Sequence, residues 1–374
     1  MTLIGKQRIV IGMYDGLGMD YMEASPLPGF RFMANQGFFK KVSAVFPTVT
    51  NANNASICCG AWPKEHGITG NSYFNEETGA ADYMESADFI CVPTIIQLAA
   101  ERGVKSALLT CKVKTIHLLG RGADIAVAAE TPPAEWVERY GKPPNIYSRE
   151  INYWLWQVAV DILKHRRDIG LLYVHTTDYP MHTWAPAAPE SKEHLATLDQ
   201  LLEEARTAAP DAAFLLTADH GMNYKTRCWD LFKACRESGT EVRFALSAEK
   251  DRYVKHHRTF GGAAWVWLNS PKDASKVADS LLKLKGVEAV MPRSDAAEKF
   301  GLMPGRIGEL AVFGDAETVF GELESPRETL EAGYRSHGSL HESDIPLIIY
   351  NSSVGLPAED AFGSNLDLTR HIVV

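Results

Sequence analysis

The sequence predicts an α/β fold, in which helices cover both faces of a mainly parallel β-sheet. Short continuous apolar runs are typical of strands buried on both faces, and they occur at residues 8–13, 106–109, 171–174, 213–217 and 345–350. Helix-like segments stand among these runs, at residues 93–101, 151–164 and 191–208. Alternation of strands and helices indicates such a layered sheet, and we expect all the runs to be parallel strands.

Residues 223–331 interrupt this alternation. They contain strand-like stretches at 242–247, 263–268 and 310–314 and a helix-like stretch at 273–284. We interpret residues 223–331 as a smaller α+β cap subdomain, inserted into a catalytic core that comprises residues 1–222 and 332–374. A second, shorter insertion or lid is expected at residues 120–148, which contain four prolines.

The bulk composition is that of a globular protein and argues against some functions. Of 374 residues, 45% are hydrophobic and 23% are charged, so large-scale disorder is not expected. The net charge of −9 argues against general nucleic-acid binding, which requires a dense basic surface. No apolar window is long enough for a membrane-spanning helix, and the N-terminal apolar run is too short for a secretory signal, so a cytoplasmic protein without a membrane partner is expected. The six cysteines match no zinc-finger or redox spacing and are expected to be buried, reduced thiols.

Polar side chains follow four of the predicted strands at the point where each strand ends. The residues concerned are Asp15, Lys112, Lys114, Asp178, Asp219 and His220. Ligands of open α/β sheets bind beyond the carboxyl ends of the strands. Because the carboxyl ends of parallel strands lie at one edge of the sheet, we expect these side chains to converge on one crevice.

Several of these side chains are suited to metal binding. Asp178 and His182 stand four residues apart, so a helical turn would place both on one face. Asp219 and His220 are costly to bury unless a cation satisfies them. Taken alone, each pair has a plain structural explanation, as a helix cap or as a surface or packed pair. Together they favour a metal site.

A third histidine completes the candidate ligands. His337 is preferred over His341 because Gly338 permits close backbone approach, and His341 is expected to be a supporting or an exposed residue. Carboxylates and imidazoles without thiolates favour zinc over manganese or iron. The candidate ligands are Asp15, Asp178, His182, Asp219, His220 and His337. They are too many for one tetrahedral ion, and they fit two ions with three ligands each.

A two-metal site is the usual clamp for in-line displacement at phosphorus, and it needs a nucleophile between the ions. The segment at residues 47–56 offers the hydroxyl groups of Thr48, Thr50 and Ser56. A threonine at a helix N-terminus is often only an N-cap, which is the plain explanation for Thr50. The same location would also assist an anion, because free backbone N–H groups point at it.

The ordered motifs resemble the alkaline phosphatase superfamily, within its nucleotide pyrophosphatase/phosphodiesterase-like branch. They are Asp-Gly at 15–16, Pro-Thr-Val-Thr-Asn-Ala-Asn at 47–53, His-Gly-Ile-Thr-Gly-Asn at 66–71, Thr-Asp-Tyr-Pro-Met-His at 177–182, Ala-Asp-His-Gly at 218–221 and Ser-His-Gly at 336–338. This resemblance implies an alkaline-phosphatase-like core and two zinc ions per chain. It assigns Asp178, His182 and His337 to one zinc. It assigns Asp15, Asp219 and His220 to the other.

The same resemblance implies the roles of three further residues. Thr50 would be the nucleophile and a fourth zinc ligand, and it would form a covalent phosphothreonine. The side-chain amide of Asn71 and the backbone N–H of Asn51 would donate hydrogen bonds to phosphoryl oxygens. The expected partner is a small anionic organophosphorus substrate, and the sequence is compatible with a homodimer.

Within this branch, the sequence is most similar to phosphonoacetate hydrolases. The likeness lies in Thr-Thr-Asp-Tyr at 176–179, followed by His182 and Ala-Pro, and in Cys-Lys-Val-Lys-Thr at 111–115. In an extended segment Lys112 and Lys114 would point to the same side and could hold a substrate carboxylate. Ordinary exposed lysines are the plain alternative. The resemblance implies zinc-dependent hydrolysis of phosphonoacetate to acetate and phosphate.

Rival functions use the same residues. A phosphodiesterase, nucleotide pyrophosphatase or phosphomonoesterase could employ the same metals and Thr50, with Tyr73, Phe74 and Tyr179 forming a slot for a nucleobase. Met181 stands where typical phosphodiesterases of this branch have glycine, which weakens the nucleotide hypothesis. A catalytically inert metal- or anion-binding protein is the rival from another class. His256 and His257, in a basic loop, are expected at the surface.

Overall fold

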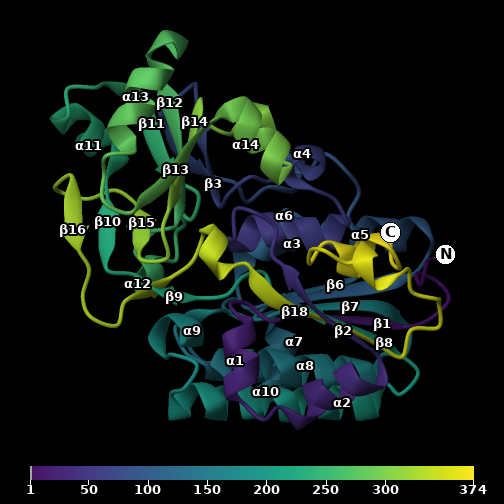
Figure 1. Cartoon of the computed structure of the whole chain (residues 1–374). Helices are drawn as coiled ribbons and strands as arrows, with labels where there is room; N and C mark the ends of the chain where they lie inside the picture. The colour runs from purple at the N-terminus through teal and green to yellow at the C-terminus, as the bar shows by residue number, and fades with distance from the viewer. Residues whose placement is uncertain (1) are drawn as a thin grey trace.

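The protein is described by a computed structural model that covers residues 2–374. Its centre is a seven-stranded sheet in the order β2-β18-β8-β1-β7-β5-β6. The strands are β1 (Ile9–Met13), β2 (Phe38–Ser43), β5 (Lys105–Thr110), β6 (Ile125–Ala128), β7 (Ile169–His175), β8 (Ala213–Thr217) and β18 (Asp344–Tyr350). Helices cover both faces of this sheet (Figure 1), as predicted for an α/β fold.

One predicted strand runs in the opposite direction from the expectation. β1, β5, β6, β7 and β8 are mutually parallel, but β18 is antiparallel to β8 and to β2. The chain reaches β18 from the loop of His337, at the same edge where the parallel strands end. Without a crossover helix the chain can only run back through the sheet, so β18 must be antiparallel.

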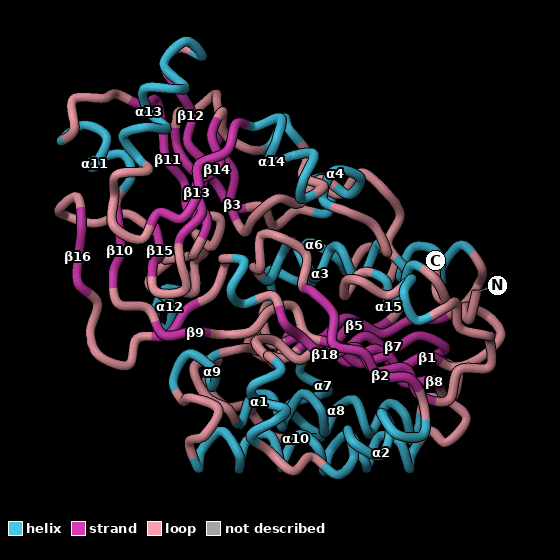
Figure 2. Tube along the Cα trace, in the orientation of Figure 1, coloured by secondary structure: helices cyan, strands magenta, loops and turns pink. Residues whose placement is uncertain are grey.

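The two helical layers lie on opposite sides of the sheet (Figure 2). One layer contains α3 (Thr50–Cys59), α5 (Ile95–Glu101), α6 (Val113–Leu119) and α15 (Asp367–Arg370). The other contains α1 (Met19–Ala24), α2 (Pro28–Gln36), α8 (Glu150–His165) and α10 (Pro189–Ala208). Shorter core elements are α4 (Pro63–His66), α7 (Ala134–Tyr140), α9 (Tyr179–Thr183) and the hairpin β3 (Ser72–Asn75) and β4 (Ala80–Tyr83). The helix predicted from residue 93 begins at Ile95, because Thr94 caps it reciprocally with Gln97.

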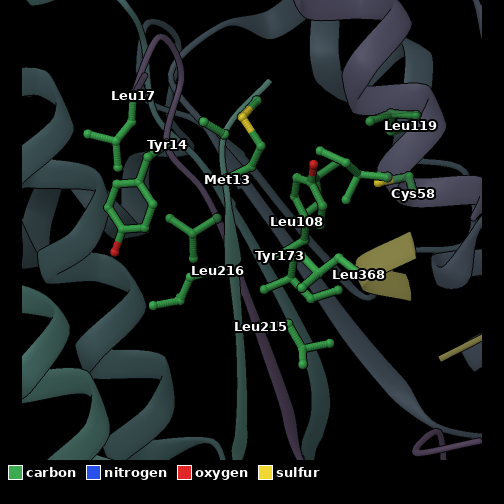
Figure 3. Close-up of a cluster of buried hydrophobic side chains, with 14 of the residues drawn as sticks. Met13, Tyr14, Leu17, Cys58, Leu108, Leu119, Tyr173, Leu215, Leu216 and Leu368 are labelled. Atoms are coloured by element: carbon green, nitrogen blue, oxygen red, sulfur yellow. The ribbon is translucent and has the colours of Figure 1, made fainter. Parts of the chain in front are cut away.

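The apolar core lies between the sheet and the helices. Figure 3 shows Met13, Leu108 and Tyr173 of the strands beside Cys58 and Leu119 of the helices. The predicted buried thiols are found for every cysteine except Cys91, which is exposed. This continuous core holds the strand ends in fixed positions.

The segment at 223–331 builds a second sheet in the order β11-β12-β14-β13. Its elements are β10 (Arg227–Trp229), α11 (Leu231–Glu237), β11 (Val242–Ser247), α12 (Val254–His257), β12 (Ala263–Leu268), α13 (Ala274–Leu281), β13 (Val287–Pro292), α14 (Arg293–Phe300), β14 (Leu310–Gly314), β15 (Thr318–Phe320) and β16 (Arg327–Thr329). Side chains of β12 alternate strictly between two apolar clusters: Ala263, Trp265 and Trp267 join the main core, whereas Ala264, Val266 and Leu268 pack with α11 and α13. One face of this sheet thus rests on the core.

The ends of the proposed cap lie side by side. β9 (Asn223–Tyr224) pairs antiparallel with β17 (Arg335–Ser336), so the chain leaves and re-enters the core at one place. The division into a core and an inserted cap remains our proposal, and this pairing favours it. Residues 120–148 differ from the lid that we expected, because β6 within them forms an edge of the main sheet. Across residues 2–374, no helix has the length and apolarity needed to cross a bilayer.

Candidate metal centre

The predicted strand-end residues gather at the carboxyl edge of the main sheet. Asp15 follows β1, Asp178 follows β7, and Asp219 with His220 follows β8. These four side chains are almost completely buried. They come from strands that are neighbours in the sheet, which is why residues distant in the sequence can share one crevice.

Asp15, Asp219 and His220 form one compact group. His220 Nε2 lies 3.5 Å from Asp15 Oδ1 and 3.3 Å from Asp219 Oδ2. None of these three atoms has a hydrogen-bond partner within residues 2–374. Buried acceptors without partners are costly, and one cation among them would satisfy all three.

Asp178 is the centre of a second group. Its Oδ2 atom lies 2.7 Å from His182 Nε2 and 3.6 Å from His337 Nε2. The His337 ring also stacks on His220, with 3.5 Å between ring centres, so the two groups are contiguous. Ligand atoms of Asp178, His220 and His337 lie close enough to share an ion as well. The structure therefore brings together all six candidate ligands, while their division between ions stays a proposal.

The three histidines present their Nε2 atoms in the same manner. Nδ1 of His182 lies 2.8 Å from the Arg335 carbonyl, and Nδ1 of His337 lies 2.8 Å from the Thr48 carbonyl. His220 Nδ1 is likewise 3.0 Å from the carbonyl of Gly221. A carbonyl only accepts, so each Nδ1 must carry the proton, and each neutral ring turns an Nε2 lone pair towards carboxylates. Nitrogen lone pairs that face carboxylate oxygens require a cation between them, so these ligand atoms fit a metal ion.

Burial and neighbouring charges tune these groups. Burial, reinforced by the Asp15 charge, raises the pKa of Asp219 well above its usual range. Burial also lowers the pKa of His220 and of His337, which keeps both imidazoles neutral as metal ligands must be. For Asp178, burial acts to raise the pKa, but neighbouring positive charge, chiefly the Lys112 ammonium, outweighs it and holds the pKa well below the usual range.

Lys112 lies inside the cluster. Its Nζ atom is 3.2 Å from Asp15 Oδ2 and 3.3 Å from Asp178 Oδ1, and its side chain is 3% exposed. We predicted an extended segment here, but Lys112 precedes α6 as its N-cap residue, and Lys114 belongs to that helix. The predicted extended segment is therefore wrong, because Lys114 lies within the helix.

Lys114 is also buried and is bound to another carboxylate. Its Nζ atom forms an ion pair with Asp251, which comes from the cap segment. Lys112 and Lys114 both lie close to the Tyr253 ring, with Nζ atoms 5.7 Å and 5.5 Å from its centre. The two ammonium groups thus lie beside the metal-ligand cluster rather than at the surface.

Thr50 is the first residue of α3, and it is 2% exposed. Val49, not Thr50, occupies the N-cap position, so the plain capping explanation does not apply. The preceding residue, Thr48, fixes the chain: its hydroxyl accepts from Gly338 N–H at 3.1 Å and donates to Ser339 O at 2.7 Å. The helix start is thereby tied to the loop of His337.

The two predicted phosphoryl donors contact each other. Asn51 N–H donates to Asn71 Oδ1 at 3.0 Å, and Asn71 Nδ2 donates to Glu249 Oε1 at 3.1 Å. In this arrangement the Asn51 N–H is engaged by the Asn71 oxygen. The second N–H of Asn71 has no protein partner within residues 2–374 and is the donor that remains for an anion.

Comparison with known proteins assigns the family. The family model for type I phosphodiesterase / nucleotide pyrophosphatase matches residues 9–340. The chain belongs to this family. Human ectonucleotide pyrophosphatase/phosphodiesterase family member 5 is 24% identical over 236 residues, which are 60% of this chain and 46% of that protein. A venom phosphodiesterase from Naja atra is 24% identical over 57% of this chain and 26% of its own length. The chain thus matches less than half the length of these relatives.

Solved structures show the same fold. A phosphonoacetate hydrolase from Sinorhizobium meliloti 1021, in complex with phosphonoacetate, has a TM-score of 0.86 at 28% identity and covers 97% of this chain and 94% of its own. Murine ectonucleotide pyrophosphatase/phosphodiesterase 5 has a TM-score of 0.68 at 16% identity, covering 97% and 93%. The alkaline phosphatase PafA has a TM-score of 0.68 at 13% identity, covering 96% and 94%. The latter two matches show the fold alone, which is alkaline-phosphatase-like.

The structure of this phosphodiesterase-family member also contains site residues that the sequence did not reveal. We placed His256 and His257 at the surface, which is wrong: both side chains are 2% exposed. His256 Nε2 lies 3.6 Å from Asp178 Oδ1, and neither ring nitrogen has a hydrogen-bond partner within residues 2–374. The cap packs this loop against the core, which the charge of the loop concealed. His341, by contrast, is exposed and pairs with Glu288 at 2.7 Å.

Two further site residues are His175 and Glu249. His175 ends β7, and its Nε2 atom lies 3.3 Å from Asp15 Oδ2, so the strand-end argument could have found it. Glu249 lies just after β11 in the cap, and no motif marks it. The aromatic slot that we considered for a nucleobase is not formed by the expected residues. Phe74 packs on Phe244 and Tyr73 on Phe89, whereas only Tyr179 approaches His256.

Proposed function

We propose that this protein is a zinc-dependent hydrolase that converts phosphonoacetate to acetate and phosphate with Thr50 as its nucleophile. The proposal rests chiefly on the two buried lysines, Lys112 and Lys114, beside the metal-ligand cluster. Their ion pairs with buried carboxylates hold two positive charges inside the site. A substrate with a carboxylate beyond its phosphorus centre would use such charges. The Sinorhizobium meliloti hydrolase, similar over almost the whole chain, supports this choice.

We further propose two zinc ions, one held by Asp178, His182 and His337 and one held by Asp15, Asp219, His220 and Thr50. Bound zinc would supply Lewis-acid polarisation and a lowered pKa for a hydroxyl group. The orphaned acceptors of the cluster support such a cation. A small anionic organophosphorus compound is the partner that these charges favour.

The side chains would divide the reaction among them. Thr50 Oγ1 gives its proton to water and forms a bond to phosphorus, and the carbon–phosphorus bond breaks with its electron pair moving to carbon. That pair spreads into the substrate carboxylate, where the ammonium groups of Lys112 and Lys114 stabilise it. The carbon then takes a proton from water, which gives acetate. The free N–H of Asn71 holds a phosphoryl oxygen, and water releases phosphate from the phosphothreonine and restores the Thr50 hydroxyl.

The test compares two substrates and three lysine variants. We expect the zinc-reconstituted protein to release phosphate from phosphonoacetate. Lys114→Met should lower this activity at least about tenfold while hydrolysis of an aryl phosphodiester changes less. Lys105→Met, at the exposed start of β5, the strand that precedes α6, is the matched control and should change neither. Lys112→Met is a weaker test, because Lys112 also contacts two carboxylates of the cluster.

A phosphodiesterase is the second candidate, and the family assignment favours it. Tyr147 and Tyr179, whose ring centres lie 5.9 Å apart beside His256, could stack against an aromatic leaving group. Turnover of the aryl phosphodiester without phosphate release from phosphonoacetate would decide for this function. Equal loss of both activities in Lys114→Met would also contradict the carboxylate-binding role.

A further inference from the structure

Glu249 is a buried carboxylate that enters the site from the cap. It lies directly after β11, and its side chain is 2% exposed. Its Oε1 atom accepts from Asn71 Nδ2 at 3.1 Å and faces His257 Nε2 at 3.7 Å. Oε2 lies 3.7 Å from His337 Nδ1 and has no hydrogen-bond partner within residues 2–374. The carboxylate thus lies between the anion donor Asn71 and a metal-ligand histidine.

Glu249 and its neighbours are poorly suited to hold a metal ion of their own, although Glu249, Asp251 and His257 lie close together. Thr259 N–H donates to His257 Nδ1 at 2.9 Å, so this nitrogen carries the lone pair and the neutral ring carries its proton on Nε2. The nitrogen that faces Glu249 is therefore a donor. Asp251 is already paired with Lys114. The cluster therefore turns a donor, rather than a lone pair that could bind a metal, towards Glu249.

The contacts of Asn71 allow only one orientation of its amide group. Asn71 Oδ1 accepts from Asn51 N–H, and Asn71 Nδ2 donates to Glu249. Exchanging the oxygen and the nitrogen would place N–H against N–H at Asn51 and oxygen against oxygen at Glu249. Glu249 therefore helps to decide which way the remaining N–H of Asn71 points.

The backbone places Glu249 with little freedom. Asn71 N–H donates to Ala248 O at 2.9 Å, which ties the two segments together next to the side-chain contact. Ser247 Oγ accepts from both Glu249 N–H and Gly261 N–H. A Cβ atom at Gly261 would lie 2.5 Å from the Glu249 Cβ, so only glycine at 261 leaves room for this carboxylate. The backbone of the cap thus holds Glu249 against Asn71.

We propose that Glu249 is a positioning residue: it fixes the Asn71 amide so that its free N–H faces a phosphoryl oxygen. This inference rests on the proposed function, since it requires the site to bind phosphoryl groups. It predicts that Glu249 acts on the phosphoryl group only through Asn71. It also predicts that an acceptor is needed at this position and that a negative charge is not.

The experiment measures the affinity of the zinc-loaded protein for inorganic phosphate by calorimetry, together with kcat and KM. Glu249→Met removes the acceptor and should weaken phosphate binding about tenfold and lower kcat about tenfold. The KM for the substrate should change little, because the contacts to its organic part are kept. Glu249→Gln keeps an acceptor and should stay within about threefold of the wild type. Asn71→Ala should resemble Glu249→Met, and the Asn71→Ala/Glu249→Met double variant should lose nothing more.

Zinc content and thermal unfolding are measured for every variant, and Glu249→Ala replaces Glu249→Met if the latter does not fold. Unchanged phosphate affinity without the acceptor would overturn the positioning role. So would losses that multiply in the double variant, because a merely structural contribution is independent of Asn71. If phosphate binds and Asn71→Ala weakens it, the proposed function survives that result. If phosphate does not bind to the wild type, the proposed function and the positioning role both fall.

Discussion

The core wall and the cap wall of the candidate site are built in different ways. Asp15, Asp178 and Asp219 follow strands of one buried sheet, and their positions derive from the sheet itself. Glu249 and His256 belong instead to residues 249–257, which are a loop and the short helix α12 of the cap. Two residues in left-handed backbone, at 258 and 259, end this segment. The cap wall is therefore held by contacts rather than by regular structure.

We infer from this difference that the two walls have different functions. The core wall carries all the candidate metal ligands that we predicted and is packed from both sides by helices. The cap wall supplies the partner of Asn71 and the partner of Lys114, and under the proposed function Asn71 and Lys114 would contact the substrate. A rigid core suits metal binding, because ligands must be held to within fractions of an ångström, whereas a cap on loops can vary with the substrate.

The largest expected effect is that of the proposed nucleophile in the core wall. Thr50→Ala should lower turnover about a thousandfold or more, because the variant lacks the oxygen that is proposed to attack phosphorus. Steady-state phosphate release measures it, with zinc content as a check. Ser56→Ala, a buried hydroxyl in the same helix that bonds to Ala52 O, is the matched control and should keep most activity. Undiminished turnover in Thr50→Ala would refute the assignment, and a fully metallated but inactive wild type would favour an inert binding protein.

Metal content should separate the two walls directly. His337→Gln should reduce bound zinc from about two ions to about one, because it removes an Nε2 ligand from the core wall. His256→Gln should leave the zinc content unchanged and affect turnover alone. Elemental analysis after dialysis measures both variants. Loss of zinc from His256→Gln would show that the cap shares a metal, which would break the division proposed here.

Many strands of the core and of the cap could be predicted, because the apolar runs that mark them are local features of the sequence. The apolar run at 213–217 coincides with β8, and the runs at 242–247 and 263–268 coincide with β11 and β12. The two strands of the main sheet that we missed, β2 and β6, lie at its edges, where half-exposed sequences lack a continuous apolar run. The direction of β18 also escaped, because direction depends on where the chain enters the sheet and not on the strand sequence.

Site residues could be predicted from position alone only where the order of the strands in the sheet brings them together. Residues after strand ends converge for a topological reason, so Asp15, Asp178, Asp219 and His220 were found together. His256 gave no such signal, because a histidine in a charged loop reads as exposed until the cap is packed on the core. Lys112 was noticed, but its contacts with Asp15 and Asp178 depend on a helix start that the spacing of two lysines does not reveal.

A buried ion pair at the junction of the two regions should matter for stability. Lys225 Nζ lies 2.7 Å from Glu342 Oε1, and both side chains are completely buried. Glu342 also accepts from Ser339, next to the loop of His337. Lys225→Met leaves this carboxylate buried without its cation and should cost about 3 kcal/mol in the free energy of unfolding.

Chemical denaturation of the variant and the wild type measures this cost. Lys250→Met, which breaks a partly exposed pair with Glu322 within the cap, is the matched control and should cost less than about 1 kcal/mol. Equal costs for the two variants would mean that the junction is no stronger than the cap surface. Cap and core would then be joined mainly by the apolar face of β12.

A last expected effect concerns acid stability in the helical layer of the core that contains α8 and α10. Burial lowers the pKa of His194 from its ordinary value of 6.5 to about 3, and its Nδ1 atom lies 3.1 Å from the Tyr153 hydroxyl. Between these two pH values the unfolded chain binds the proton and the folded chain does not, so stability falls as the pH falls from about 6.5 towards 3, by at most about 1.4 kcal/mol per pH unit. His194→Gln removes this titration and should flatten the pH dependence of the unfolding free energy between pH 6.5 and 4. An unchanged slope would mean that other groups cause the loss of stability in acid. The carboxylates and imidazoles where the core wall meets the cap wall would then be replaced next, one at a time.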